Sequence, residues 1–311
     1  MGIARRCALG GAVIATVIAM APHAYASQTL VAADMSLNRD HFGNIVLNTD
    51  GASLNCNFNT IFGDASQGAT IQVTARWVTV ENCVITGGTA GISLIDANEG
   101  NFIENTVNGS TGPGCLLVNS HLNAFTDSNF WNNPGGGCVL EGSNFNIFER
   151  NSISSNGDEG VDLETSNNNS FTGNEVFSNV VDGFDLGDSH ANALRENAVG
   201  WNGMNGIELD DSEQNFIEDN DVSFNGRGAF ESPPREPRSG ISLGTSSNNG
   251  TRRNIVNGNS RNGLRIIDFS NTNDVDSNSG CNNGQIDGFV DASSVGNRFF
   301  GNMFCTGNIP A

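Results

Sequence analysis

The 311-residue chain contains no lysine, and its formal net charge at pH 7 is −20. All fourteen basic residues are arginine, against 34 aspartates and glutamates. Such an acidic chain is not expected to bind nucleic acid, whose recognition needs a basic surface. An acidic polysaccharide would also be repelled, unless a cation or a local group of arginines bridged the two negative charges.

The chain also lacks a sustained helical pattern of apolar residues, and beyond residue 26 no segment is apolar enough to span a membrane. What it has is a repeat of 23 residues marked by glycine. A period of this length is typical of solenoid proteins, in which each repeat forms one coil. The glycines at this spacing are Gly91, Gly114, Gly137, Gly160, Gly183 and Gly206, followed by Gly240 and Gly263 after one insertion.

Apolar columns keep step with the glycines and predict three short strands in each coil. Apolar and polar residues alternate around these columns, as in Val161-Asp162-Leu163-Glu164, which is typical of strands with one buried face. A further column is mostly asparagine, which accepts the left-handed backbone of a tight bend and can hydrogen-bond its counterpart one coil away. We therefore expect an all-β solenoid of nine to ten coils, stacked about 4.8 Å apart.

This pattern resembles the right-handed parallel β-helix proteins of the pectate-lyase-like superfamily. That group includes polygalacturonases, pectate and alginate lyases, mannuronan epimerases and phage tailspikes. The resemblance covers residues 45–305, with an insertion loop at 226–239, and implies a β-helix fold. Because the whole superfamily shares the repeat consensus, the resemblance selects no single activity. Residues 27–44 are expected to form an N-terminal cap, and residues 306–311 a C-terminal tail.

Residues 1–26 are typical of a secretory signal peptide. Arg5 and Arg6 precede an apolar run from Ala8 to Met20, and Ala24-Tyr25-Ala26 is a small-residue cleavage site. The sequence therefore predicts a secreted or periplasmic protein.

Cysteine usage agrees with export, because oxidising compartments favour disulfides. Cys115 and Cys138 occupy the same place in adjacent coils, and Cys281 and Cys305 differ by one place, so both pairs are within disulfide reach. Buried free cysteines are the alternative for the first pair. Cys56 and Cys83 are out of phase by four places, and their pairing stays open.

Acidic residues gather at the outward positions of the first strand in successive coils. Asp162, Asp185 and Glu208 share one column, here named the acidic column, with neighbouring carboxylates about 5 Å apart. Their repulsion predicts either a bound proton or a cation, and calcium prefers oxygen ligands. Carboxylates at this spacing also suit acid and base roles at a glycosidic bond. A solvated acidic face is the alternative. The predicted calcium ligands are Asp162, Glu164, Asp185 and Glu208; the outward acids near the column also include Asp188, Asp210 and Asp211.

The insertion follows directly after these coils and is rich in arginine. In repeat proteins an insertion forms a loop on one face, often the binding face. Carboxylates on one side of a cleft and guanidiniums on the other would suit a sugar acid. A surface loop without a ligand is equally consistent with the sequence. The predicted substrate-binding residues are Arg227, Arg235, Arg238 and Arg252.

Three segments resemble polygalacturonase motifs. Asn179 to Asp185 is similar to N-T-D-G-F-D, Ser239 to Thr245 to H-G-x-S-I-G-S, and Gly263 to Ile267 to G-V-R-I-K. Only Asp182 and Arg265 carry over, because Asn205-Gly206, Ser239 and Ile267 replace the aspartate pair, the histidine and the lysine. His121 and His190 occupy one slot three coils apart, about 14 Å, which argues against a shared copper or zinc ion and against the related factor for copper-centre assembly in nitrous oxide reductase.

Two hypotheses remain from the sequence. In the first, the protein binds and processes a polysaccharide, expected to be acidic, as a lyase or a glycoside hydrolase, with an epimerase disfavoured because its Pro and catalytic His are missing. The catalytic candidates are Asp182, Asp185, Asp188, Glu208, Asp210, Asp211 and Arg265, with Ca2+ as a possible cofactor. In the second, it is a non-catalytic β-helix that binds glycans or builds the cell surface.

Overall fold

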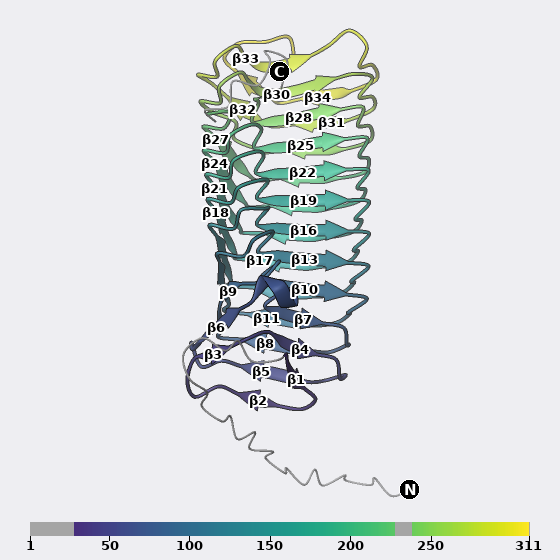
Figure 1. The fold of residues 1–311 in the computed structure, drawn as a ribbon. Helices are drawn as coiled ribbons and strands as arrows, with labels where there is room; N and C mark the ends of the chain where they lie inside the picture. The colour runs from purple at the N-terminus through teal and green to yellow at the C-terminus, as the bar shows by residue number, and fades with distance from the viewer. Residues whose placement is uncertain (1–27, 228–237, 311) are drawn as a thin grey trace, which may run out of the picture.

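The computed structural model describes residues 28–227 and 238–310, which form a right-handed solenoid of three parallel β-sheets (Figure 1). Most coils contribute one strand to sheet A, then one to sheet B, then one to sheet C. Sheet A contains β1 (Thr29–Val31), β4 (Ile45–Leu47), β7 (Ile71–Val73), β10 (Ile92–Ile95), β13 (Cys115–Val118), β16 (Cys138–Glu141), β19 (Val161–Glu164), β22 (Phe184–Gly187), β25 (Ile207–Asp210), β28 (Ile241–Gly244), β30 (Asn262–Ile267) and β33 (Ile286–Val290).

Sheets B and C form the other two sides of the solenoid. Sheet B contains β2 (Met35–Ser36), β5 (Ser53–Asn55), β8 (Thr79–Glu81), β11 (Asn101–Ile103), β14 (Ala124–Thr126), β17 (Ile147–Glu149), β20 (Ser170–Thr172), β23 (Ala193–Arg195), β26 (Phe216–Glu218), β29 (Gly250–Arg252), β31 (Asp274–Asp276) and β34 (Arg298–Phe300). Sheet C contains β3 (His41–Phe42), β6 (Thr60–Gly63), β9 (Val84–Gly87), β12 (Thr106–Asn108), β15 (Asn129–Trp131), β18 (Ser152–Ser154), β21 (Glu175–Phe177), β24 (Ala198–Gly200) and β27 (Asp221–Ser223). A separate pair, β32 (Ser279–Gly280) and β35 (Met303–Phe304), continues this side, and the 3-10 helix η1 (Ala65–Gln67) lies between β6 and β7.

The all-β solenoid is confirmed, but it has more coils than the nine to ten predicted. Twelve strands stack in sheet A of the described residues. The segment expected to be a cap supplies β1, β2 and β3, which pair with the strands of the following coil. The glycine period begins only at Gly91, and the earlier coils differ from it in length: Thr29 pairs with Ile45, and Ile45 with Ile71. Counting repeats of 23 residues in the sequence therefore left these earlier coils out.

The core lies inside the three sheets and is built from columns of identical or similar side chains. In sheet B the rings of Phe102, Phe125, Phe148 and Phe171 stack face to face, with centroids 4.5 to 4.9 Å apart. All four are fully buried. The strand alternation thus places one side chain of each repeat inward, and the coil spacing stacks it on its counterpart.

Asparagine ladders hold the turns together. The backbone N–H of Asn151 donates to Oδ1 of Asn174 at 2.9 Å, and its side-chain amide donates to the carbonyl of Phe125 at 2.9 Å. The same pattern repeats at Asn174 and Asn197, which confirms the predicted ladder. The structure adds two further ladders, one through Asn146 in the turn from sheet A to sheet B and one through Asn156 in the turn from sheet C to sheet A. Buried backbone N–H groups in these turns therefore find partners.

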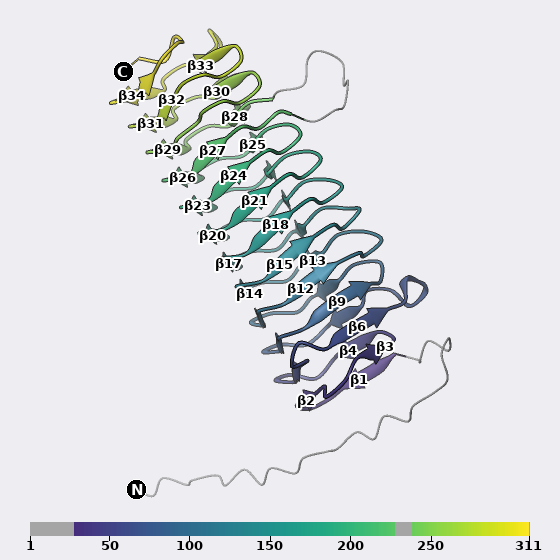
Figure 2. The ribbon, with the colours of Figure 1, turned by 90° about the vertical axis from the view of Figure 1, so that its left-hand side faces the viewer.

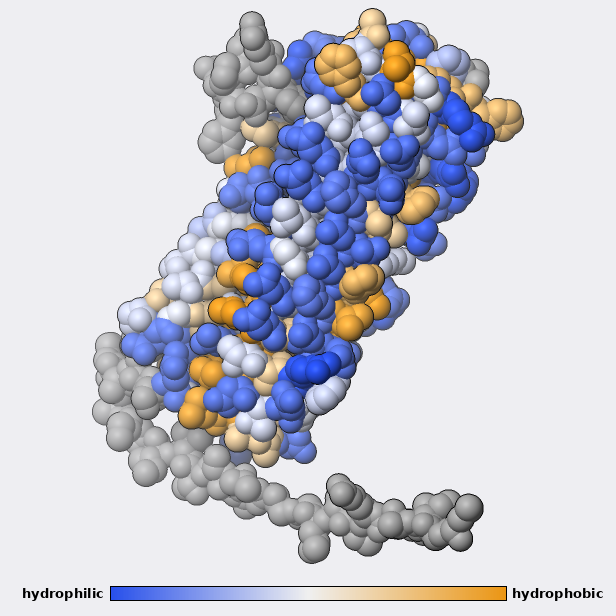
Figure 3. Space-filling model, turned by 90° about the vertical axis from the view of Figure 1, so that its right-hand side faces the viewer, coloured by the Kyte–Doolittle hydropathy of each residue, from blue (hydrophilic) through white to orange (hydrophobic). Residues whose placement is uncertain are grey.

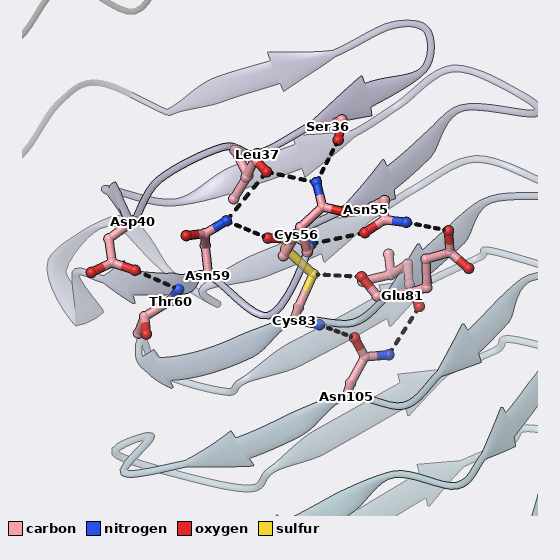
Figure 4. Close-up of a disulfide and its surroundings, with 12 residues drawn as sticks. Ser36, Leu37, Asp40, Asn55, Cys56, Asn59, Thr60, Glu81, Cys83 and Asn105 are labelled. Carbon is pink, nitrogen blue, oxygen red and sulfur yellow. Dashed lines mark hydrogen bonds between the residues drawn. A yellow bond between two sulfur atoms is a disulfide. The ribbon is translucent and has the colours of Figure 1, made fainter.

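All three cysteine pairs are disulfide-bonded: Cys115 with Cys138, Cys281 with Cys305, and Cys56 with Cys83. The pair left open by the sequence therefore also bonds (Figure 4). Figure 4 shows Asn59 and Asn105 beside it, donating to the carbonyl of Cys56 and accepting from the N–H of Cys83. Each bond joins two neighbouring coils; Cys56, Cys83, Cys115 and Cys138 are buried in the core, whereas Cys305 is exposed.

The insertion leaves the register of the sheets undisturbed. Across it, Ile207 pairs with Ile241 and Glu208 with Ser242, and the extra residues come between β27 and β28 in the sequence. Figure 2 shows the strands of sheet C stacked in chain order up to β27. At the C-terminal end, Gly307 bridges to Gly288, so the predicted tail lies against the last coil. The side formed by turns from sheet A to sheet B is mainly hydrophilic, with isolated hydrophobic residues (Figure 3).

In the described residues, no helix is long and apolar enough to cross a membrane. The predicted signal peptide lies outside the residues that the structure describes.

Candidate functional site

The acidic column lies on the outer face of sheet A, at the middle of its strands. In β19, Val161 and Leu163 are buried in the core, so Asp162 between them points outward. Asp162 pairs in register with Asp185, and Asp185 with Glu208. Because neighbouring strands lie about 4.8 Å apart, the sequence prediction that these carboxylates are near neighbours follows directly from the register.

The acidic column holds its protons more tightly than exposed carboxylates do. Burial, with repulsion from Asp185 next, raises the pKa of Asp162 to about 7. Burial and the charge of Asp210 raise the pKa of Asp185 to about 6. Burial, followed by the charges of Asp185 and Asp210, raises the pKa of Glu208 to about 7. Carboxylates that titrate near neutrality can both give and take a proton.

A second row of polar residues borders the column where the chain enters sheet A, one place before the repeat glycines. Asp182 is buried there and accepts a hydrogen bond from the backbone N–H of Asn205. Burial, together with the charge of Glu208, raises the pKa of Asp182 well above its ordinary value. Glu159, one coil before, is half-buried, and burial raises its pKa to about 8.

Asn205 connects this row to the acidic column. Its side-chain amide donates to Oε2 of Glu208 at 2.8 Å, and its Oδ1 accepts from the backbone N–H of Ser239 at 2.8 Å. The hydrogen bond to Glu208 favours the ionised carboxylate and opposes the effect of burial. Asn205 is fully buried, so these contacts hold it in place.

The column continues beyond Glu208 through Ser242 to Arg265. Ser242 is 1% exposed although it points outward, and its hydroxyl has no hydrogen-bond partner among the described residues. Burial lowers the pKa of the Arg265 guanidinium, and the charges of Asp268 and Glu208 oppose this lowering. The outer face of sheet A thus carries three carboxylates, an unpartnered hydroxyl and one cation along a single line.

Four predicted acids lie away from this line. Asp188 and Asp211 are exposed in the turn from sheet A to sheet B, at φ of 47° each, three residues past Asp185 and Glu208. At about 3.3 Å per residue they are about 10 Å away. Glu164 and Asp210 are exposed at the outward positions nearest that turn. The structure therefore brings together Asp162, Asp182, Asp185, Glu208 and Arg265. Glu164 and Asp210 are near enough for their charges to act on the column, and Asp188 and Asp211 lie further away.

Two of the four predicted substrate-binding arginines, Arg227 and Arg252, lie away from the acidic column. The guanidinium of Arg227 lies over the rings of Trp201 and Phe224, 4.7 and 5.6 Å from their centroids, at the end of sheet C. Arg252 belongs to sheet B, where it pairs with Glu218 and Asp274. Arg238 directly precedes Ser239 at the entry to sheet A, and Arg235 lies outside the described residues.

The predicted calcium ligands do not converge. Among the described residues, no group of three or more His, Cys, Asp or Glu side chains is arranged to hold a metal ion. His121 and His190 accept hydrogen bonds at Nδ1 from the backbone of Asn144 and Glu213, in turns three coils apart.

Sequence reasoning missed Glu159, Asn205 and Ser242 as members of the site. Glu159 and Asn205 share a place with Asp182, directly before the repeat glycine, and that shared place was the available signal. Ser242 follows Glu208 in the same column, but its burial cannot be read from the strand pattern.

Comparisons with known structures match the fold to carbohydrate-active proteins. The mannuronan C-5 epimerase AlgE6 A-module of Azotobacter vinelandii is 14% identical, covers 91% of this chain and 81% of its own, and has a TM-score of 0.66. The periplasmic alginate epimerase AlgG is also 14% identical, with 89% of this chain and 77% of its own covered and a TM-score of 0.70. The catalytic domain of a GH87 alpha-1,3-glucanase is 11% identical, with 89% of this chain and 63% of its own covered and a TM-score of 0.61. At these identities the likeness shows the fold alone.

No curated protein matches the sequence significantly. Two family models each match about half of the chain. The model described as right handed beta helix region matches residues 43–199, and the model described as periplasmic copper-binding protein (NosD) matches residues 153–311. The second match stands against the sequence argument from His121 and His190, although the structure does keep those histidines apart. The chain therefore belongs to the right-handed β-helix family and, over its C-terminal half, to the NosD family.

Proposed function

We propose that the protein binds a polysaccharide along the outer face of sheet A and hydrolyses its glycosidic bonds with carboxylates of the acidic column. The observation that carries the proposal is the in-register row of Asp162, Asp185 and Glu208, whose pKa values lie near 7, 6 and 7. The carbohydrate-active neighbours with this fold support a glycan as the ligand.

The roles follow from spacing and acidity. Neighbouring carboxylates about 5 Å apart match the separation in retaining glycosidases. Glu208, with the higher pKa, donates a proton to the glycosidic oxygen as the bond to the anomeric carbon breaks. Asp185, with the lower pKa, attacks that carbon and forms a glycosyl ester. In the second step Glu208 removes a proton from a water molecule as its oxygen attacks the anomeric carbon, the ester bond breaks, and Asp185 is released as a carboxylate while Glu208 is again protonated. Asn205 positions Glu208 through its hydrogen bond.

Other chemistries have less support. A lyase that used calcium would need converging oxygen ligands, which the described residues do not provide. The NosD family name implies copper. However, all six cysteines of the described residues are in disulfides, and His121 and His190 lie three coils apart. These residues do not fit a copper site.

The test is to incubate the purified protein with a panel of neutral, acidic and basic polysaccharides and to measure new reducing ends. We expect reducing ends without absorbance from unsaturated products, and no effect of a chelator. Asp185→Asn and Glu208→Gln should each lower the rate at least about 100-fold, because each removes an acid or base group. Asp211→Asn, an exposed acid in the neighbouring turn, is the charge-matched control.

Unsaturated products would replace hydrolysis with a lyase reaction. If the protein binds a polysaccharide of the panel but releases no product from any of them, it is a glycan-binding solenoid without a catalytic role.

A further inference from the structure

We infer that the glycan bound on sheet A is cationic, a chain of amino sugars with free amino groups over the acidic column and acceptor groups over Ser242 and Arg265. This inference rests on the proposed function for the location of the site. It replaces the acidic polysaccharide expected from the sequence with one of opposite charge.

The charges facing the column are nearly all negative. Asp185 is flanked in register by Asp162 and Glu208, and Glu164 and Asp210 stand at the next outward positions of their strands. Asp182 and Glu159 border the column on the side where the chain enters sheet A. The cation in line with the column is Arg265, two strands beyond Glu208, and Arg261 lies near enough for its charge to act on Arg265. A uronate would add to the repulsion within this group, whereas an ammonium relieves it.

An ammonium group also matches the hydrogen-bonding chemistry of the column. It carries three N–H donors and no acceptor, while ionised carboxylates are acceptors only. The column runs along the solenoid axis, so an extended glycan on this face meets one carboxylate in each of three coils. A divalent metal ion would need ligands gathered around one point, and the described residues offer no such group.

Ser242 is the independent observation that points to a ligand. Its hydroxyl is buried, unpartnered and in line with Glu208 on the outward face. A buried hydroxyl without a partner is costly, and a ligand atom at this place removes that cost. Beside it, Arg265 offers only donors. The ligand group over this pair is therefore an acceptor, such as the carbonyl of an N-acetyl group or a sugar hydroxyl, and a free amine is excluded from this end.

Calorimetric titration with three soluble hexamers tests the inference: partly N-acetylated glucosamine, fully N-acetylated glucosamine and galacturonate. Near pH 7, where the acidic column is largely ionised, and at low salt, we expect the partly N-acetylated hexamer to bind at least about tenfold more tightly than the fully acetylated one, and galacturonate not to bind. Asp185→Asn and Glu208→Gln should each lower the affinity for the partly N-acetylated hexamer by about tenfold. Asp211→Asn should leave this affinity unchanged. Ser242→Ala should weaken both acetylated hexamers.

Tighter binding of galacturonate, or equal binding of all three hexamers, would overturn the inference and leave hydrolysis at the column intact. Equal loss of affinity in Asp211→Asn would show that the acidic protein attracts any polycation, and would also overturn it. Binding of the amino sugar with the expected variant pattern, but without cleavage, would support the inference and reject the hydrolytic function.

Discussion

The side-chain amide of Asn205 donates a hydrogen bond of 2.8 Å to Oε2 of Glu208. The same residue donates its backbone N–H to Asp182 and accepts from Ser239. This fully buried residue thus contacts both carboxylate rows of sheet A, Asp182 through its backbone N–H and Glu208 through its side chain, and its side-chain amide favours the ionised form of Glu208.

Asn205→Ala is expected to raise the pKa of Glu208 above about 7, because the hydrogen bond that stabilises the ionised carboxylate is lost. Titration of the Glu208 carboxyl carbon by NMR measures the shift directly. Asn262→Ala removes an amide two coils further along the same row and should leave Glu208 unchanged. A lowered or unchanged pKa in Asn205→Ala would contradict the assigned role.

Stability is expected to fall as the pH rises from about 4.5 to about 8. Glu159, Asp162, Asp185 and Glu208 have pKa values raised by burial, so in this window the folded chain binds protons that the unfolded chain has released. The unfolded state then binds fewer protons, and the free energy of unfolding decreases with pH. We expect a loss of at least about 2 kcal/mol, since one pKa unit corresponds to about 1.4 kcal/mol.

Thermal unfolding across this pH range measures the loss. The slope depends on the groups facing the column, which include Asp158, Glu164, Asp210 and Arg265. Asp162→Asn should reduce the slope of stability against pH, because one carboxyl with a raised pKa is removed while its neighbours remain. A melting temperature that rises toward pH 8 would refute the sign of the effect.

Phe148→Ala is expected to destabilise the protein by about 3 to 5 kcal/mol, because it opens a cavity in the stacked column between Phe125 and Phe171. Phe145→Ala is the matched control, since that ring is 53% exposed three residues earlier. Urea unfolding of both variants compares them. Equal effects would show that the buried stack contributes no more than a surface ring.

Thr251→Val is expected to stabilise the protein by about 1 kcal/mol. Thr251 pairs with Ile217 and Val275 in sheet B and is fully buried, and its hydroxyl has no hydrogen-bond partner. Replacing the hydroxyl by a methyl group of similar shape removes that unsatisfied group. Differential scanning calorimetry detects the change, and Thr251→Ser, which keeps the hydroxyl, should not raise the melting temperature.

Features that depend only on the repeat register could be predicted from the sequence. The asparagine ladder, the acidic column and the disulfide of Cys115 with Cys138 all follow from residues 23 places apart, because parallel coils stack equal places on each other. The first coils could not be counted because their lengths depart from that spacing.

Placement around the solenoid was harder to predict than placement along it. Arg227 and Arg252 seemed to join the acidic column because they are close to the insertion in sequence. The chain turns between sheets every few residues, so Arg227 reaches the rings at the end of sheet C and Arg252 pairs on sheet B. Burial of an outward side chain such as Ser242 depends on what lies above the sheet, and the alternating strand pattern carries no such information.

The ladders make the length of the molecule a separate variable from its chemistry. Each coil contacts the next through the same asparagine and strand bonds, so a copied unit such as residues 92–114 would find matching partners on both sides. One such unit would move the N-terminal end about 4.8 Å further from the acidic column and leave Asp185 and Glu208 as neighbours. The number of N-terminal coils therefore sets the distance between that end and the acidic column.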